Sequence, residues 1–150
     1  MEMLNEIKFY AVSNEYGEFS NFYNSPIKVG KYTWPTVEHY FQAQKFAGSE
    51  YEHMIRKAKS PMKAAELGRN RKIKIRSDWE SVKINVMREA VHTKFHQHPE
   101  LRILLLSTGD AKIIEHTSND NFWGDGGDGK GQNWLGKILM EIRAEFKTVS

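Results

Sequence analysis

Prolines and glycines divide this chain into short segments, and most of these segments carry apolar residues at helical spacing. Proline is favoured at the first position of a helix and glycine just after its last, so these residues mark helix starts and ends. The clearest segment follows residue 134, where apolar side chains recur on one helical face. The pattern predicts five helices over residues 35–47, 51–57, 61–68, 78 to about 96, and 99–109. A sixth helix carries its apolar face at Leu135, Ile138, Leu139, Ile142 and Phe146.

Strand patterns are few and short. Residues 7–11 alternate apolar and other side chains, and residues 27–34, IKVGKYTW, read as a hairpin around a glycine. KIIEHT, from Lys112, is a further short strand candidate. Strands and helices do not alternate, so a parallel α/β fold is not expected. We expect a mainly α fold, a single compact helical domain over residues 1–150 with a small N-terminal β-hairpin.

Composition narrows the class of protein. The chain has 150 residues, 39% hydrophobic and 27% charged, which is typical of one globular domain. It has no cysteine, which excludes disulfides, thiolate zinc sites and cysteine nucleophiles. The first ten residues show no secretory signal, and the longest apolar run, residues 103–106, is far too short to span a bilayer. We expect a cytoplasmic enzyme or binding module that does not associate with membranes.

Positive charge gathers in residues 56–76, which contain nine Lys or Arg and a single acid, Glu66. Such a run is either a solvated surface or a site for an anionic partner, such as a phosphate, a nucleotide or a nucleic acid. The sequence leaves both interpretations open.

Residues 119–136, NDNFWGDGGDGKGQNWLG, combine flexible glycines with large aromatic side chains. The stretch superficially matches a P-loop, but Gly131 stands where that motif needs a Ser or Thr for magnesium. A dinucleotide fingerprint needs a parallel βαβ unit, and an EF-hand needs oxygen ligands in a register that is absent here. A flexible surface loop would not explain Phe122 and Trp123 beside Asp120.

Residues 34–46, WPTVEHYFQAQKF, place a polar stripe on the predicted helix. Glu38, Gln42 and Lys45 lie at i, i+4 and i+7, with aromatic residues around them. The stripe faces either solvent or a cavity, and spacing alone does not decide between the two. His92 and His96 also share a helical face, but the pattern places no third ligand beside them, so we expect no metal and no cofactor.

Four blocks of this sequence resemble the signature blocks of the YbiA-like family, also called NADAR. They are EFSNFY (18–23), WPTVEHYFQAQKF (34–46), LGR (67–69) and NDNFWGDGGDGKGQNWLGKILMEIR (119–143). The resemblance covers nearly the whole chain in the expected order. It implies a mainly helical domain and an N-glycosidase that cleaves the C1′–N bond of phosphorylated ribosylamino-pyrimidine intermediates of riboflavin biosynthesis. Other members remove ADP-ribose from modified guanine, and the unusual richness of the loop in Gly and Asp leaves substrate selection open.

The resemblance also implies roles for individual residues. Cleavage of a ribosyl C–N bond builds positive charge on the sugar, which a carboxylate stabilises. Glu38 and Asp120 are the catalytic carboxylates expected, with Lys45 as a third catalytic residue. Aromatic faces hold the base, and cations or backbone amides hold the 5′-phosphate. The expected substrate-binding residues are Trp123, Phe19, Trp34, Arg69, Asn21, Gln42, Glu115 and Gly124.

Alternatives remain open for several of these residues. Lys45 is either a phosphate ligand, with water attacking C1′ directly, or a nucleophile that forms a Schiff base with the opened ribose. A purely structural interpretation is open for three residues. In it Glu38 only pairs with Gln42 or Lys45, Trp123 is a core residue, and Asp120 is a turn residue. The expected partner is a phosphorylated ribosyl small molecule. The alternative partner is an ADP-ribosylated nucleic acid, and no obligate protein partner is expected. The alternative function is that of a non-catalytic nucleotide-binding module.

Overall fold

The structure, a computed structural model, describes residues 5–148. Within that range the chain forms six α-helices, one short 3-10 helix and four short strands. These elements divide into two compact units. Unit 1 combines the chain up to Ser20 with the chain from His98 onwards, and unit 2 is the continuous stretch Asn21–Gln97.

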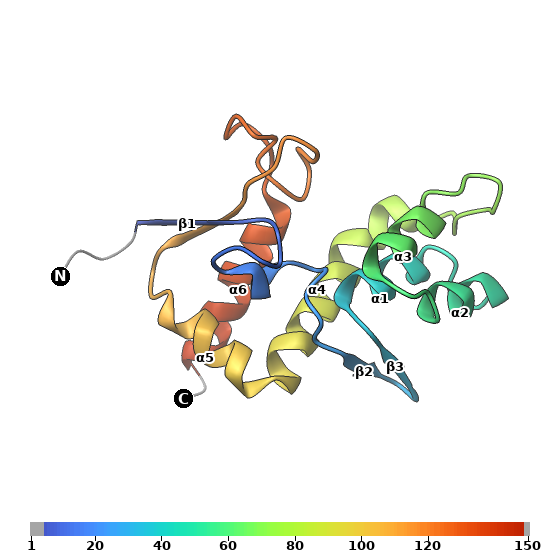
Figure 1. Cartoon of the computed structure of the whole chain (residues 1–150), viewed down its shortest axis with the longest axis horizontal. Coiled ribbons are helices and arrows are strands. Elements are labelled where there is room, and N and C mark those ends of the chain that lie inside the picture. Colours follow the sequence, from blue (N-terminus) through green and yellow to red (C-terminus); the bar gives the residue numbers. More distant parts are fainter. Residues whose placement is uncertain (1–4, 149–150) are drawn as a thin grey trace. The chain divides into compact units, whose positions relative to one another are not determined.

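Unit 2 contains a β-hairpin and four helices (Figure 1). The hairpin pairs β2 (Ile27–Val29) with β3 (Tyr32–Trp34) in an antiparallel arrangement. Gly30 at its turn has a φ of 62°, in the left-handed region that glycine adopts without steric cost. The hairpin predicted over residues 27–34 is therefore confirmed. The helices are α1 (Val37–Gln44), α2 (Glu50–Arg56), α3 (Pro61–Gly68) and α4 (Trp79–Gln97).

α1 is shorter than the helix predicted over residues 35–47. Thr36 ends the preceding extended segment with a φ of −146°, and its Oγ1 accepts a hydrogen bond from the His39 amide at 3.2 Å. A threonine in this position is a helix N-cap, so the helix starts after Thr36 and Pro35 lies outside it. The helix ends at Gln44, after which the chain continues in turns.

α3 has the boundaries that the sequence predicts. The Ser60 hydroxyl accepts from the Lys63 amide at 3.0 Å, Pro61 occupies the first helical position, and the helix ends at Gly68. A hydroxyl cap followed by proline is a local signal that needs no tertiary contact.

α4 starts beside Asp78, as predicted, but the Asp78 carboxylate is engaged elsewhere. It accepts two hydrogen bonds from Arg76, at 2.6 and 2.9 Å, while the Asp78 backbone carbonyl accepts from the Val82 amide. The buried face of α4 includes Met87 and also a buried lysine, Lys94. The other buried residues of α4 are Trp79, Ala90, Val91 and Phe95.

Unit 1 is built on a parallel strand pair. β1 (Glu6–Phe9) lies beside β4 (Lys112–Glu115), with Glu6 opposite Lys112. The first strand was expected to reach residue 11 and ends two residues earlier. The other elements of this unit are a 3-10 helix η1 (Gly17–Phe19), α5 (Pro99–Ser107) and α6 (Trp134–Thr148).

The predicted apolar face of α6 is buried as expected, at Leu135, Ile138, Leu139, Ile142 and Phe146. A buried arginine joins it. Arg143 Nη1 donates to Thr108 Oγ1 and to the Ala111 carbonyl, both at 2.8 Å. These bonds tie α6 to the segment between α5 and β4, and they satisfy a charge that would otherwise be costly to bury.

The mainly α fold with a small β-hairpin is confirmed. No helix in the described residues is long and apolar enough to cross a membrane. The division into two units does not test the expectation of one domain over residues 1–150, which stays a prediction, as does the cytoplasmic location.

Candidate active site

The polar stripe of α1 is buried within unit 2. Glu38, Gln42 and Lys45 are 9%, 8% and 7% exposed. The spacing along the helix left open whether the stripe faces solvent or the interior. Its low exposure shows that it faces the interior of the unit. Buried ionisable groups are costly unless they are hydrogen-bonded, so their partners decide what the stripe can do.

Glu38 is held by its own helix. Gln42 Nε2 donates to Glu38 Oε2 at 2.7 Å, and the Glu38 amide donates to the Asn21 carbonyl at 3.1 Å. The pairing with Gln42 that sequence reasoning considered is thus present. The carboxylate also sits in the first turn of α1, where the helix dipole favours negative charge.

Lys45 follows the last residue of α1 and reaches the end of α3. Its Nζ donates to the Gly68 carbonyl at 3.3 Å. Burial, followed by the nearby positive charge of Arg71, lowers the pKa of Lys45 from 10.5 to about 8, and the charge of Glu38 opposes this change. An amine with such a pKa is partly neutral near physiological pH, as general bases and amine nucleophiles require.

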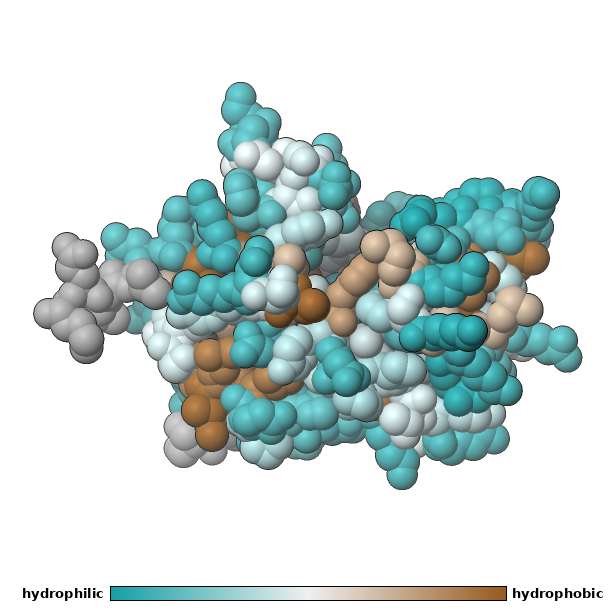
Figure 2. All heavy atoms as spheres, in the orientation of Figure 1, coloured by the Kyte–Doolittle hydropathy of each residue, from teal (hydrophilic) through white to brown (hydrophobic). Residues whose placement is uncertain are grey.

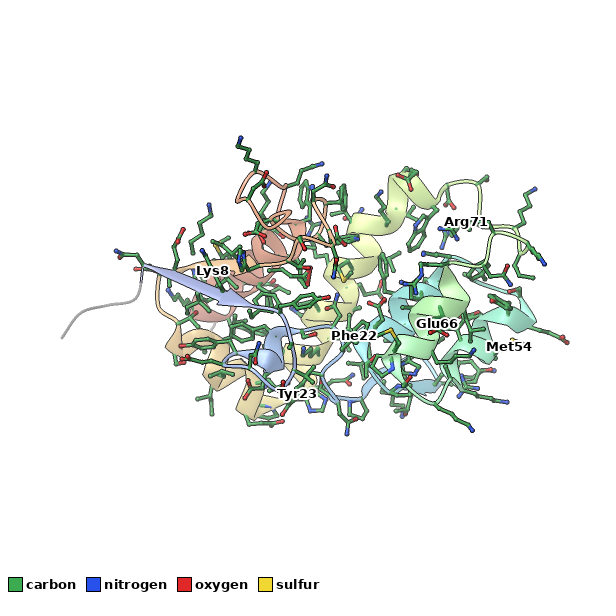
Figure 3. The ribbon with its side chains drawn as sticks, turned by 45° about the horizontal axis from the view of Figure 1, so that its top comes forward. Lys8, Phe22, Tyr23, Met54, Glu66 and Arg71 are labelled. Atoms are coloured by element: carbon green, nitrogen blue, oxygen red, sulfur yellow. The ribbon has the colours of Figure 1, made fainter. Side chains whose placement is uncertain are left out.

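Arg71 is a residue that sequence reasoning did not assign to the site. It lies on the loop after α3 (Figure 3), and its Nη1 donates to the Gly68 carbonyl at 2.9 Å. Arg69, which was expected to bind substrate, is exposed beside it and also lowers the pKa of Lys45. Figure 2 shows mainly hydrophilic residues on the visible face over α3 and this loop. Only membership of the basic stretch pointed to Arg71 in advance.

Two other expected substrate-binding residues are buried in unit 2. Asn21 Nδ2 donates to the sulfur of Met87 at 3.5 Å, and its Oδ1 has no hydrogen-bond partner. The Trp34 ring packs edge-on against Tyr40 at 5.2 Å, and its Nε1 also has no acceptor. In this conformation both side chains belong to the core of the unit, so their contact with substrate stays a prediction.

Asp120, in unit 1, organises a turn of the glycine-rich loop. Its Oδ1 accepts from the amides of Phe122 at 2.9 Å and Trp123 at 2.8 Å. The turn role considered for this residue is therefore present, and a catalytic role has to rest on Oδ2. Asp120 as a catalytic residue stays a prediction.

Asp125 and His116 form a second anchor of the loop, which sequence reasoning missed. Asp125 is 4% exposed, and its Oδ2 lies 2.7 Å from His116 Nδ1. Its Oδ1 accepts from the amides of Thr117 at 3.1 Å and Gly127 at 2.9 Å. Burial raises the pKa of the Asp125 carboxyl, but the bonds from His116, Gly127 and Thr117 outweigh it and hold that pKa below its usual value.

The glycines of the loop serve its internal packing. The amides of Gly126 and Gly131 donate to the backbone carbonyls of Asp120 and Asp125, and the Gly127 amide is held by the Asp125 carboxylate. These three amides already have acceptors, and phosphate binding by the other amides of the loop stays a prediction. Gly124 is buried, and a Cβ there would lie 2.8 Å from the Glu115 carbonyl oxygen.

The remaining expected residues of unit 1 differ in exposure. Phe19 is 1% exposed, with its ring against Phe9 and Tyr16, so it offers no free face to a base in this conformation. Trp123 is half-buried, edge-on to Phe122 at 4.8 Å, and Glu115 is half-buried at the end of β4. Their roles in binding stay predictions, as does that of Gly124.

The histidines of α4 do not form part of a metal cluster in the structure. The rings of His92 and His96 lie 6.0 Å apart. Over the described part of the chain, no three or more His, Asp or Glu side chains are grouped as metal ligands.

The site combines a buried carboxylate with a lysine of lowered pKa, and exposed cations lie beside the lysine. These groups are typical of an enzyme that applies acid–base or nucleophilic chemistry to an anionic substrate. Residues 8–147 match the NADAR domain family, and the chain belongs to this family.

Known proteins agree with this assignment. N-glycosidase YbiA of Escherichia coli (strain K12) is 58% identical over 140 residues, which cover 93% of this chain and 88% of that protein. The NMR structure of E. coli YbiA matches with a TM-score of 0.90 at 55% identity, covering 99% of this chain and 89% of that one. Riboflavin biosynthesis protein PYRR of Zea mays is 44% identical over 157 residues, covering 95% of this chain and 25% of that protein. The expected family and the reaction class of N-glycosidase are confirmed.

Proposed function

We propose that this N-glycosidase cleaves the C1′–N bond of phosphorylated ribosylamino-pyrimidines, the intermediates of riboflavin biosynthesis. The observation that carries the proposal is the burial of Glu38, on α1, and of Lys45, directly after α1, with Arg69 and Arg71 beside Lys45. A carboxylate and an amine suit glycosidic chemistry, and the arginines suit a phosphate. The name of the maize relative, a riboflavin biosynthesis protein, supports the substrate class.

In the proposed reaction the C1′–N bond breaks, and its electron pair leaves with the pyrimidine nitrogen. The Glu38 carboxylate stabilises the positive charge that develops on the ribose. The oxygen of a water molecule bonds to C1′, Glu38 accepts one of its protons, and the departing nitrogen then receives that proton. The products are ribose 5-phosphate and the free aminopyrimidine.

Lys45 supports a second version of this chemistry. Its pKa of about 8 leaves part of the amine neutral, so it can bond to C1′ of the opened ribose while the pyrimidine amine leaves. Water then hydrolyses the resulting Schiff base and restores the lysine. Borohydride added during turnover separates the two versions, because it reduces a Schiff base to a stable adduct on Lys45. A mass spectrum without that adduct, under conditions of active turnover, favours direct attack by water.

The cations near Lys45 are proposed to hold the 5′-phosphate. Arg69 and Arg71 are exposed, whereas the acid of this stretch, Glu66, lies 3.6 Å from Lys63. The remaining positive charge therefore has little local compensation, which favours a dianionic group. For the glycine-rich loop, a catalytic role of the Asp120 carboxylate and a base-stacking role of Trp123 are proposed only on the resemblance of the loop to the family.

One experiment tests the substrate class. The protein is incubated separately with a ribosylamino-pyrimidine phosphate and with ADP-ribosylated guanine, and the released base and sugar phosphate are measured. Release from the first supports the proposal, whereas release from the second alone assigns the alternative substrate. A non-catalytic nucleic-acid module would release neither and would bind plain duplex DNA with a steep salt dependence, about one unit of slope per neutralised phosphate.

A further inference from the structure

The Gln42 amide is held between two neighbours. Its Nε2 donates to Glu38 Oε2 at 2.7 Å, and its Oε1 is buried without a hydrogen-bond partner. The side chain was expected to bind substrate, yet its donor is already used by the carboxylate. The bond to Glu38 also orients the amide, because the reversed orientation would set its oxygen against the carboxylate.

Gly68 provides the space for this amide. A Cβ at Gly68 would overlap Gln42 Oε1 and lie 2.7 Å from Gln42 Cδ, closer than real Cβ contacts allow. Gly68 ends α3 and is not among the described residues with positive φ, so its backbone does not require glycine. The requirement is steric and comes from Gln42.

The unpaired oxygen of Gln42 is an energetic cost that an apolar residue would avoid. A buried carbonyl group without a donor destabilises the folded chain, and an alanine or leucine at this position would remove the penalty. The compensating feature is the Nε2 bond to Glu38. A residue that is unfavourable for packing but bonded to a proposed catalytic group indicates a role in the site.

We propose that Gln42, seated against Gly68, is a positioning residue that holds the Glu38 carboxylate ionised and in one orientation. α3 thereby sets the geometry of a carboxylate that belongs to α1. The Gly68 carbonyl also accepts from Lys45 Nζ, so one residue without a side chain adjoins both Lys45 and the amide that holds Glu38. This inference rests on the proposed function of Glu38.

Three variants test it: Gln42→Ala, Gly68→Ala and the double variant. The matched control is Gln44→Ala, because Gln44 also lies on α1 and donates to a carboxylate, Glu52 Oε2, at 3.1 Å. Gln42→Ala and Gly68→Ala should each lower kcat on a ribosylamino-pyrimidine phosphate by about 10- to 100-fold, with KM within threefold. The acid limb of the pH–rate profile should move to higher pH, because the ionised carboxylate loses a donor.

The double variant separates positioning from general damage. If Gly68→Ala acts by displacing the amide, it should cost little further once Gln42 is Ala, because Oε1 and Cδ are then absent and only the Cβ of residue 42, at 3.0 Å, remains beside the added methyl. Additive losses in the double variant contradict the proposal. If Gly68→Ala does not fold, Gln42→Ala and the double variant still carry the test.

A readout independent of turnover distinguishes this inference from the proposed function. The Glu38 side-chain carboxyl is titrated by carbon NMR, with Glu38→Gln used to assign its signal. The titration midpoint should rise in Gln42→Ala and stay unchanged in Gln44→Ala. An unchanged midpoint in Gln42→Ala overturns the inference even if Glu38 proves catalytic. A further outcome is a shifted midpoint in Gln42→Ala while Glu38→Gln turns over at the wild-type rate. That pair of results would support the positioning role of Gln42 and exclude a catalytic role for Glu38. A raised KM with an unmoved acid limb would make Gln42 a substrate ligand instead.

Discussion

Lys45 and Arg71 share one hydrogen-bond acceptor, the carbonyl oxygen of Gly68, at 3.3 and 2.9 Å. Their nitrogen atoms therefore lie within about 6 Å of each other, a range in which like charges disfavour each other's ionised form. Glu38 and Glu80 act in the opposite direction on the Lys45 amine, and Arg69 adds to the effect of Arg71. The guanidinium of Arg71 is permanently charged, so the lysine is the group that responds.

Replacement of Arg71 should change the pH dependence of the enzyme. Arg71→Gln removes a positive charge, so the Lys45 pKa should rise from about 8 toward 10.5. If the neutral amine attacks the ribose, the rise of kcat with pH should then move to higher pH, and the rate at neutral pH should fall. The measurement is a pH–rate profile of both proteins. Lys72→Gln, an exposed cation on the same loop, is the control and should leave the profile in place.

Glu38→Gln should remove most turnover while the fold persists. The amide keeps the shape of the carboxylate but cannot stabilise developing positive charge, and loss of one such group costs about 100- to 1,000-fold in kcat. Steady-state kinetics measure the rate, and circular dichroism checks the fold. Glu50→Gln, at an exposed position of α2, should be neutral. Turnover of Glu38→Gln within threefold of wild type would exclude a catalytic role for this carboxylate.

Local chemistry explains which parts of this structure were predictable. The boundaries of α3 follow from Ser60 and Pro61, which act within one turn of the chain. The burial of the α1 stripe, in contrast, depends on α3 packing against it, and spacing along α1 carries no information about that neighbour. Contacts across long separations were missed altogether, as the pairing of β1 with β4 shows.

The glycine loop illustrates the same limit within a few residues. Its composition indicated an unusual role for aromatic and acidic side chains, but not which acid serves which purpose. Asp120 and Asp125 look alike in the sequence, yet Asp120 accepts from the amides of Phe122 and Trp123, whereas Asp125 bonds His116 and the Gly127 amide. Only the folded path of the loop distinguishes them.

Asp125→Asn should loosen the loop without unfolding its unit. The amide side chain has no charge, so the bonds from His116, Thr117 and Gly127 weaken. Amide hydrogen exchange at Thr117 and Gly127 should accelerate. Asp128→Asn is the control, since Asp128 is exposed and accepts from the nearby Lys130 amide at 2.9 Å. Equal protection in wild type and Asp125→Asn would mean that the carboxylate does not hold the loop.

The same carboxylate predicts how loop order depends on pH. The folded pKa of Asp125 lies below its usual value of 3.8, so its contribution to stability is fully present above that value. It should be lost as the pH falls through the lower, folded pKa. Hydrogen exchange in the wild-type loop should therefore accelerate in strong acid, and Asp125→Asn should lack this pH dependence.

Trp123→Ala should weaken capture of the base but not of the sugar phosphate. Loss of one stacking face costs about 1 to 3 kcal/mol, which is roughly 5- to 150-fold in Kd. Calorimetry with a base-containing analogue and with ribose 5-phosphate compares the two ligands on the same protein. Ribose 5-phosphate should bind almost as to wild type. If the analogue also binds equally, Trp123 is a packing residue.

The order of the units along the chain has a consequence for synthesis. Unit 2 is one continuous stretch, so all of its contacts become available once Gln97 has left the ribosome. Unit 1 cannot close at that stage, because β1 waits for a partner strand about 100 residues downstream. We therefore expect nascent chains to acquire α1 to α4 cotranslationally, with β1 left as an unpaired edge until β4 emerges. The interval in which β1 lacks its partner strand would then end late in translation, after the completion of unit 2 and with the docking of α6 on β4.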